Sequence, residues 1–266
     1  MTEPTGTTGT TDPPEPVLDV RDEARVRVLT FNRPGARNAF DLALYSALTA
    51  ALHEALADDG VHAVVVTGAG TAFSAGQDLR EMTALATGTA PEGAEQGFQN
   101  LLEVVQSFDK PLIAAVNGFG VGWGFTMLGH CDIVFMADTA RLKVPFAELA
   151  VAPEAGSSYL FPQRFGWMRA AHILLSSDWV SAEQALDWGI AFELCPPDDL
   201  LPTTLAYAQR IASASLDSLR AIKGLMLAAH LPEIRQARQR EEEAFATLLF
   251  SATTRDALDQ FTGGTP

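Results

Sequence analysis

Short apolar segments recur along the first half of the sequence, and helical patterns separate them. Four segments have the length and residue types of strands: ARVRVLTF, HAVVVTG, PLIAAVNG and DIVFMA, at residues 24–31, 62–68, 111–118 and 132–137. Between the first two, residues 41–58 repeat leucine every four residues after a suitable N-cap, Asp41, which predicts an amphipathic helix. Strands that alternate with helices fold into a sheet covered by helices, so we expect an α/β protein.

The pattern changes after about Pro197, where only helical patterns follow, at residues 198–213, 215–230, 233–250 and 253–261. A helical stretch of this length needs a further surface for its apolar positions, in its own core or on a neighbouring subunit. We therefore divide the chain into three parts: a Thr, Gly and Pro rich tail at 1–16, expected to be disordered, a core at 17–197, and a helical oligomerisation region at 198–266. A Gly, Pro and Ala rich stretch at 87–97 predicts a mobile loop.

Composition and charge argue against several classes of function. A formal net charge of −15 argues against nucleic acid as a partner, because phosphates require a basic surface. No apolar run approaches the roughly 20 residues of a membrane span, and the N-terminus has no signal-peptide pattern. Cys131 and Cys195 stand in apolar contexts that indicate reduced thiols, so we expect a cytoplasmic protein without membrane contact. The five histidines lack HxH or HxxxH spacing, so no metal site is expected.

Two glycine-rich stretches follow apolar strands, TGAGTAFSAGQDLREM at 67–82 and VNGFGVGWGFTMLG at 116–129. Glycines after a strand allow turns that direct backbone N–H groups into a cavity, where they can hold a phosphate or a developing oxyanion. Neither stretch matches the dinucleotide fingerprint GxGxxG with its downstream acid, and neither contains the GK[ST] of a phosphate-binding loop. Taken alone, such stretches more often serve tight turns and close packing.

Several motifs together form a more specific pattern: NRPGARNAF at 32–40, AFSAGQDLREM at 72–82, KPLIAAVNG from Lys110, the segment 132–166 and SAEQALDWGI at 181–190. In this order and spacing they resemble the enoyl-CoA hydratase/isomerase, or crotonase, superfamily over about residues 25–266. The resemblance implies the crotonase fold, a spiral of ββα units with a C-terminal α-helical trimerisation region, and hence a homotrimer or a dimer of trimers. It also implies an acyl-CoA thioester as substrate, bound by the core, and no further cofactor.

The same resemblance implies an oxyanion hole. Two backbone N–H groups, of Gln77 after Gly76 and of Trp123 after Gly122, would hold the thioester oxygen. Both residues are bulkier than the small ones common in the family, and we expect their side chains to affect the shape of the pocket. The hole itself should persist, because a backbone donor does not depend on its side chain.

Contacts to the adenine and pantetheine of coenzyme A are implied for the segments that hold Ala36, Arg37, Ala75, Asp78 and Leu79. These segments also contain Arg33 and Arg80, so we expect local positive charge near the ligand in spite of the acidic chain. For Asp78, a turn within its own loop is an equal alternative to a contact with the nucleotide.

The catalytic carboxylate is inferred from the acids that are present and absent. Hydratases of the superfamily use two glutamates to activate water, and by motif these positions are Thr126 and Phe146 here, neither of which can exchange a proton with water. PFAELAVAPEAGSS instead resembles the segment of peroxisomal-type delta-3,delta-2-enoyl-CoA isomerases whose glutamate is the catalytic base, which is Glu154 here. Two glycines of that segment are replaced by Ala150 and Ala155, and we expect the turn to persist.

These residues favour an enoyl-CoA isomerase of fatty acid oxidation. Glu154 would move a proton from C2 to C4 of the acyl chain, while the oxyanion hole holds the dienolate. An enoyl-CoA hydratase remains an alternative, as does another isomerase such as the ring-opening type of phenylacetate degradation, which the AGQDL string resembles. A non-catalytic acyl-CoA-binding module is the alternative from another class. A further acid, Glu148, could face the pocket, but we expect it to be solvated or ion-paired.

Overall fold

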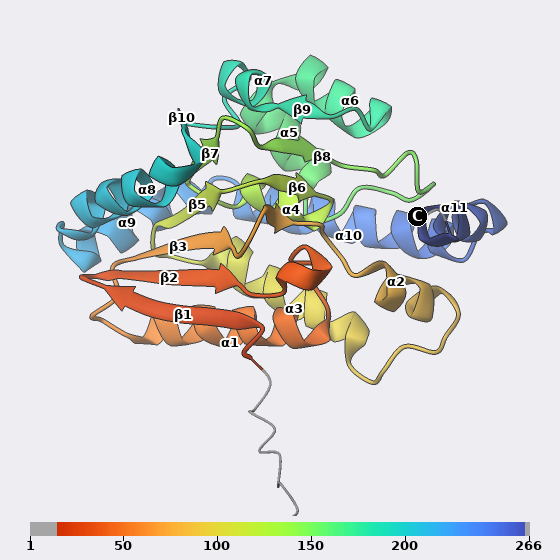
Figure 1. Cartoon of the computed structure of the whole chain (residues 1–266), viewed down its shortest axis with the longest axis horizontal. Helices are drawn as coiled ribbons and strands as arrows, with labels where there is room; N and C mark the ends of the chain where they lie inside the picture. Colours follow the sequence, from red (N-terminus) through yellow and green to blue (C-terminus); the bar gives the residue numbers. More distant parts are fainter. Residues whose placement is uncertain (1–14, 264–266) are drawn as a thin grey trace, which may run out of the picture.

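A computed structural model describes residues 15–263 of the chain. Its largest element is a six-stranded sheet in the order β1-β2-β3-β5-β7-β10, parallel throughout except for the hairpin β1–β2 (Figure 1). The strands are β1 (Leu18–Glu23), β2 (Val26–Phe31), β3 (Ala63–Gly68), β5 (Leu112–Val116), β7 (Ile133–Ala137) and β10 (Glu193–Cys195). β3 and β5 are buried almost entirely, as is typical of the central strands of a parallel sheet.

A second sheet contains four short strands in the order β4-β6-β8-β9. They are β4 (Ala72–Ser74), β6 (Phe119–Val121), β8 (Arg141–Lys143) and β9 (Val180–Ser181). Each of β4, β6 and β8 directly follows a strand of the large sheet, and helices follow each pair. This repeat of two strands and a helix is the spiral of ββα units that the resemblance implied, so the predicted fold is confirmed.

The helices of the core cover the sheets. They are α1 (Leu42–Ala57), α2 (Leu79–Ala86), α3 (Ala94–Ser107), α4 (Trp123–Thr126), α5 (Ser157–Phe165), α6 (Trp167–Ser176) and α7 (Ala182–Asp187), with single turns η1 (Pro34–Ala36) and η2 (Met127–Gly129). α1 packs against β1 and β2. It begins where predicted, because the Asp41 carboxylate accepts a hydrogen bond from the N–H of Leu44 at 2.9 Å and caps the helix.

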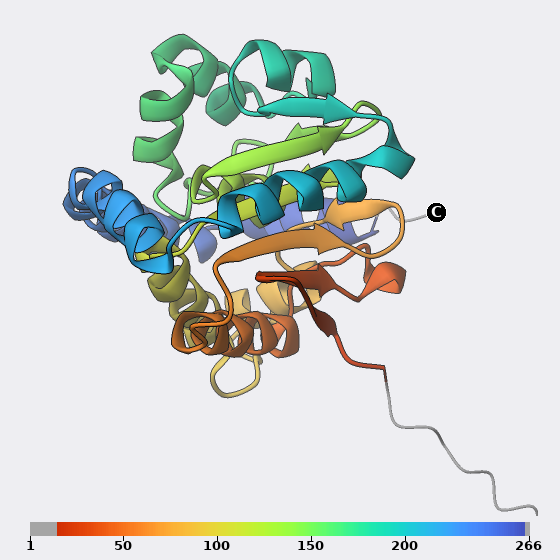
Figure 2. The same cartoon turned by 90° about the vertical axis from the view of Figure 1, so that its left-hand side faces the viewer.

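The C-terminal region is helical throughout its described part, as predicted, with α8 (Pro197–Ala212), α9 (Leu216–Ala228), α10 (Leu231–Leu249) and α11 (Ala252–Gly263). α8 packs against β3, β5 and β7 (Figure 2). α10 contacts α3 and α5, and α11 contacts α2. The last two helices therefore return to the core beside the segments that follow β4 and β8.

Several local predictions need correction. β1 was not expected, because five of its six residues are exposed and its sequence lacks an apolar pattern. The strand predicted from residue 24 begins at Val26, since Ala24 turns the hairpin with a φ of 56°. The loop predicted at 87–97 is shorter, because α3 begins at Ala94. The strands of the second sheet have only two or three residues, too few for a periodic pattern.

Other expectations concern the termini, the thiols and the membrane. Residues 1–14 of the predicted tail lie outside the described residues. Cys131 and Cys195 are both buried free thiols, so the two do not form a disulfide. Within residues 15–263, none of the helices combines the length and the hydropathy that crossing a membrane requires.

Candidate active site

The two glycine-rich stretches meet at Gly76 and Gly122. Gly76 has a φ of 86°, and a Cβ at this position would lie 2.5 Å from the carbonyl oxygen of Val121 and 3.3 Å from the backbone nitrogen of Trp123. Gly122 has a φ of 53°, in the left-handed region that favours glycine. These glycines let the backbone after β4 approach the backbone after β6 more closely than any side chain would permit. Gln77 and Trp123 therefore lie at the point of closest approach.

The direction of the Gln77 backbone is fixed by an isolated parallel bridge to Phe40. The N–H of Phe40 donates to the carbonyl of Gly76 at 2.7 Å, and the N–H of Asp78 donates to the carbonyl of Phe40 at 2.9 Å. Because successive peptide groups of an extended strand point in opposite directions, the N–H of Gln77 points away from Phe40. It has no hydrogen-bond acceptor among the described residues.

Trp123 is the first residue of α4, so its N–H lies among the free donors of a helix start. That N–H also lacks an acceptor in the part of the chain that the structure describes. The indole does not line the cavity described below. It is buried and contacts the rings of Phe98, Phe40 and His130, with centroids 5.3, 6.4 and 6.4 Å away. The expectation that both bulky side chains shape the pocket therefore holds for Gln77 and not directly for Trp123.

Glu154 lies in the loop between β8 and α5 and is one of the residues that line the cavity described below. Its Oε1 accepts a hydrogen bond from the hydroxyl of Thr126 at 3.3 Å. The pKa of Glu154 is raised to about 7, mainly by burial and next by the nearby charge of Glu241, while the hydrogen bond from the Thr126 hydroxyl partly opposes the rise. Glu154 can thus both accept and release a proton near neutral pH.

The cavity has a volume of about 340 Å³. The core contributes Gln77, Glu154 and residues of α3 such as Phe98, while α10 contributes Glu241 and Phe245. Apolar side chains form much of the remaining wall, among them Leu85, Leu102, Leu249 and Phe250. This arrangement places one proton-exchanging carboxyl beside an apolar chamber, close to the segment that carries a free N–H.

The profile of the enoyl-CoA hydratase/isomerase family matches residues 21–263. The chain belongs to this family. It is 33% identical over 204 residues, or 76% of its length, to the 1,2-epoxyphenylacetyl-CoA isomerase of Escherichia coli, of which it covers 78%. It is 37% identical over 210 residues, or 78% of its length, to enoyl-CoA delta isomerase 2 of Rattus norvegicus, of which it covers 53%.

Two solved structures have the same fold. An enoyl-CoA hydratase/isomerase from Pseudoalteromonas atlantica has a TM-score of 0.88 at 32% identity, covering 94% of this chain and 98% of that one. An enoyl-CoA hydratase from Mycobacterium marinum has a TM-score of 0.76 at 47% identity, covering 80% and 99%. The chain is therefore an enzyme of the enoyl-CoA hydratase/isomerase family. The names of these proteins divide between isomerase and hydratase, so membership leaves that choice open.

The loop of this hydratase/isomerase-family enzyme that carries Glu154 is held by the core. The carbonyl of Glu154 accepts from the N–H of Ser157 at 3.0 Å and from the Ser157 hydroxyl at 2.6 Å. The carbonyl of Ala155 lies 2.8 Å from Nε2 of His130. Burial lowers the pKa of His130 to about 4, so the ring is neutral and its Nε2–H donates this bond. Sequence reasoning considered His130 only as a metal ligand and missed this role.

Ala150 and Ala155 both adopt left-handed conformations, with φ values of 54° and 62°. The turn therefore persists without the glycines of the related segment, as expected. A left-handed conformation costs a residue with a Cβ about 1 kcal/mol, which explains why glycine suits these positions.

The segments predicted to contact coenzyme A lie side by side. The N–H of Ala75 donates to the carbonyl of Arg37 at 2.9 Å, and Ala36 ends η1 directly before Arg37. Leu79 begins α2, and Asp78 caps that helix by accepting from the N–H of Arg80 at 3.0 Å. None of these residues lines the cavity, so they form a separate surface beside Gln77.

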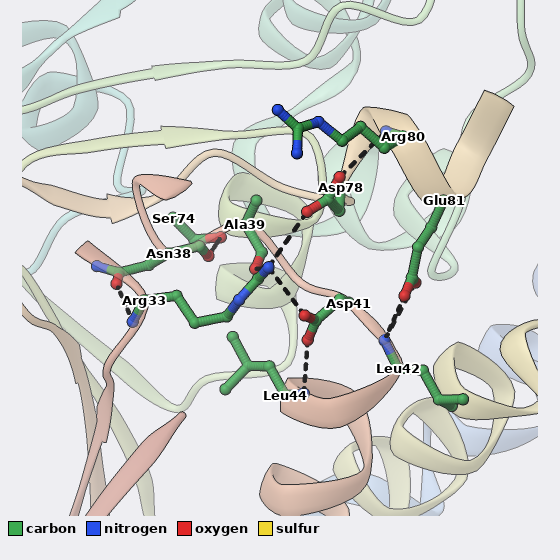
Figure 3. A network of polar contacts seen from close by, with 10 residues as sticks. All are labelled: Arg33, Asn38, Ala39, Asp41, Leu42, Leu44, Ser74, Asp78, Arg80 and Glu81. Carbon is green, nitrogen blue, oxygen red and sulfur yellow. Dashed lines mark hydrogen bonds and ion pairs between the residues drawn. The ribbon is translucent and has the colours of Figure 1, made fainter. Parts of the chain in front are cut away.

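Asp78 also pairs with Arg33 at 3.4 Å, and Arg33 pairs with Asp41 at 2.8 Å (Figure 3). Of the two roles considered for Asp78, these contacts support the turn within its own segment. The charge of Arg33 is neutralised by two carboxylates. Among the three arginines expected near the ligand, Arg37 and Arg80 are exposed and have no carboxylate partner within the described residues.

The remaining candidate positions lie away from the cavity. Phe146 is buried in the hydrophobic core and does not reach the cavity wall. Glu148 pairs with Lys143 at 2.7 Å, so the expected ion-paired acid is confirmed.

The acid that sequence reasoning missed is Glu241, which lines the cavity from α10 and belongs to none of the motifs. Glu241 stands in a run of polar residues within α10, and such a pattern is typical of a solvent-exposed glutamate, so the sequence did not single it out.

Proposed function

We propose that the chain is a delta-3,delta-2-enoyl-CoA isomerase that moves a carbon–carbon double bond of an acyl-CoA. The N–H groups of Gln77 and Trp123 hold the thioester oxygen as negative charge develops on it. Glu154 removes a proton from C2 of a 3-enoyl thioester, which leaves a dienolate, and returns the proton to C4. Thr126 holds the Glu154 carboxyl by a hydrogen bond during this exchange. Coenzyme A enters as part of the substrate, along the surface that contains Arg37 and Arg80.

The observation that carries this proposal is the pairing of Glu154 with Thr126 at 3.3 Å. Thr126 occupies one position at which the related hydratases have a glutamate, and Phe146, at the other, is buried away from the cavity. Isomerisation requires one base that releases the proton it has taken, and a carboxyl with a pKa of about 7 suits this task. Activation of water by the family mechanism requires two carboxylates.

Hydration is the second candidate, because Glu241 is a second carboxylate in the same cavity. Its two oxygens accept the N–H groups of Gly156 and Ser158 at 2.6 and 2.8 Å. A carboxylate with both oxygens engaged by fixed donors is a poor base toward water. We therefore rank hydration below isomerisation.

The charges around the cavity favour a neutral acyl group. Arg238 is a basic residue of the wall, and it pairs with Glu103 at 2.9 Å and with Glu242 at 3.0 Å. Its charge is thus balanced, while Glu154 and Glu241 add negative charge. A carboxylate at the far end of the acyl chain would be repelled. An apolar chain or ring suits the walls formed by Phe98 and Phe245.

The decisive experiment compares the wild type with Glu154→Gln on a 3-enoyl-CoA and on a 2-enoyl-CoA. Gln keeps the size of Glu154 but cannot accept the C2 proton, so isomerisation should fall by about two to four powers of ten. Binding of coenzyme A should persist. Full isomerisation by Glu154→Gln would contradict the role of this base. Hydration of the 2-enoyl substrate by the wild type, at a rate equal to isomerisation, would favour the second candidate.

We further propose a homotrimer or a dimer of trimers. Large apolar side chains are exposed on the described helices, including Leu225 and Met226 on α9 and Trp167 and Met168 on α6. From the sequence, the C-terminal apolar residues Leu225, Leu227, Phe245, Leu249 and Phe250 are expected to drive assembly. Of these, Leu225 and Phe250 are exposed, Leu227 and Phe245 are half-buried, and Leu249 is buried within the chain. Light scattering at micromolar concentration should give three or six times the mass of one chain, and a mass near 28.4 kDa would refute assembly.

A further inference from the structure

Glu241 caps a helix that lies far from it in the sequence. It belongs to α10, and only 5% of its surface is exposed. Its Oε2 accepts from the N–H of Gly156 at 2.6 Å, and its Oε1 accepts from the N–H of Ser158 at 2.8 Å. These are N-terminal donors of α5, and only Ala155 and Gly156 separate that helix from Glu154. A side chain from the C-terminal region thus fixes the turn that carries Glu154.

The same side chain brings a second negative charge into the cavity. Burial is the main cause of the raised pKa of Glu154, and the charge of Glu241 is the next. Burial also raises the pKa of Glu241, but the donors of Gly156 and Ser158 oppose that rise. Further charged or titratable groups near this pair are Tyr45 on α1, His130 after α4, and Arg238, Arg240 and Glu242 on α10. The two N–H bonds that its oxygens accept favour the ionised form of Glu241, whereas Glu154 has only the Thr126 hydroxyl as a donor.

We propose that Glu241 is a positioning residue for Glu154: it fixes the turn that carries this base and faces the base with a second negative charge. Helix α10 then takes part in the reaction through Glu154, without touching the reacting atoms. A cap of this kind restricts the backbone on either side of Gly156, which adopts a left-handed φ of 74° and, lacking a Cβ, is otherwise free to adopt many conformations. The inference rests on the proposed function, because it requires that Glu154 exchanges the proton.

The test compares Glu241→Gln with Glu243→Gln, which removes a charge from an exposed position on the same helix. Gln at position 241 keeps the size, removes the charge and replaces one acceptor by a donor. The acid limb of kcat/KM for a 3-enoyl-CoA should move to lower pH by about half to one unit, because a like charge no longer opposes ionisation of Glu154. The plateau kcat should fall about tenfold, as expected for a displaced catalytic group, with KM changed less than about threefold. Glu243→Gln should behave as the wild type.

Glu241→Asp separates the charge from the position. It keeps a negative charge on a shorter side chain, so the acid limb should stay near that of the wild type while kcat falls. Melting curves and coenzyme A binding by calorimetry establish that each variant is folded and binds. If Glu241→Gln does not fold, Glu241→Asp carries the test, and a wild-type kcat there overturns the inference.

Failure of this inference differs from failure of the proposed function. An unmoved acid limb in Glu241→Gln, with Glu154→Gln inactive, overturns the role of Glu241 and leaves the isomerase assignment intact. Full activity in Glu154→Gln overturns the isomerase assignment itself. Equal losses in Glu241→Gln and Glu243→Gln would indicate a general effect of charge on α10 and would also overturn the inference.

Discussion

The candidate site has two halves that are built in different ways. The half after β4 and β6 supplies backbone N–H groups, whose directions are set by a strand bridge and by glycines at the point of contact. The half formed by the loop before α5 and by α10 supplies side chains, namely Glu154, Glu241 and much of the apolar wall. The first half depends on backbone conformation and tolerates unusual side chains such as Trp123. The second half depends on packing between elements that are distant in the sequence.

This difference predicts how each half responds to substitution. A change of side chain should matter little in the first half unless it prevents the close approach of the two backbones. In the second half, a change of one carboxylate should alter both catalysis and its dependence on pH.

The largest effect in the backbone half is expected for Gly76→Ala. The added Cβ would meet the carbonyl oxygen of Val121 at 2.5 Å, at a φ of 86° that alanine rarely adopts. The two donors would separate, and kcat should fall by about 10²- to 10³-fold, the loss seen when one oxyanion donor is removed. Gly224→Ala is the control, because a Cβ there meets nothing within 4 Å. Wild-type kinetics in Gly76→Ala would show that the glycine contact does not set the donors.

The dependence on pH tests the side-chain half. If Glu154 is the base, as proposed, its pKa of about 7 means that kcat/KM should fall about tenfold per pH unit below that value. The raised pKa also affects stability: its favourable contribution is complete below the ordinary value of 4.5 and is lost as the pH rises through about 7. At 1.36 kcal/mol per unit, the loss amounts to about 3 kcal/mol.

Glu154→Gln removes the cost of ionising a buried carboxyl group. The substitution should therefore raise the free energy of unfolding at pH 8 and leave it nearly unchanged at pH 4.5. Urea unfolding at the two pH values measures the difference. Equal stability of the variant and the wild type at pH 8 would contradict the buried, ionised carboxylate.

The smallest effect is expected for Gln77→Ala. The N–H remains in place and the bridge to Phe40 involves backbone atoms alone, so the rate should stay within about tenfold of the wild type, or about 1.4 kcal/mol. Initial rates on a 3-enoyl-CoA measure this change. A loss of about a thousandfold would mean that the Gln77 side chain takes part, and the contrast between the two halves would then fail at this position.

Sequence patterns were reliable where the physical cause is local. The leucine repeat and the Asp41 cap specified α1 to within one residue, and the long apolar strands were found because burial on both faces requires continuous apolar runs. The short strands of the second sheet were missed, since two or three residues carry no period. The sequence motifs identified which residues were candidates for the site. They did not reveal that Arg33 is already neutralised by Asp41 and Asp78.

The sequence by itself determined the α/β fold and the glycine positions at which two backbones meet, and its resemblance to the family indicated Thr126 and Phe146 at the positions of the two hydratase glutamates. Each of these is a property of residue type at a given position. Only the tertiary structure decided what surrounds Glu154, because burial, the His130 bond and the charge of Glu241 arise from packing between distant elements. Glu241 lies 85 residues from the Gly156 that it binds, and no local pattern encodes such a contact.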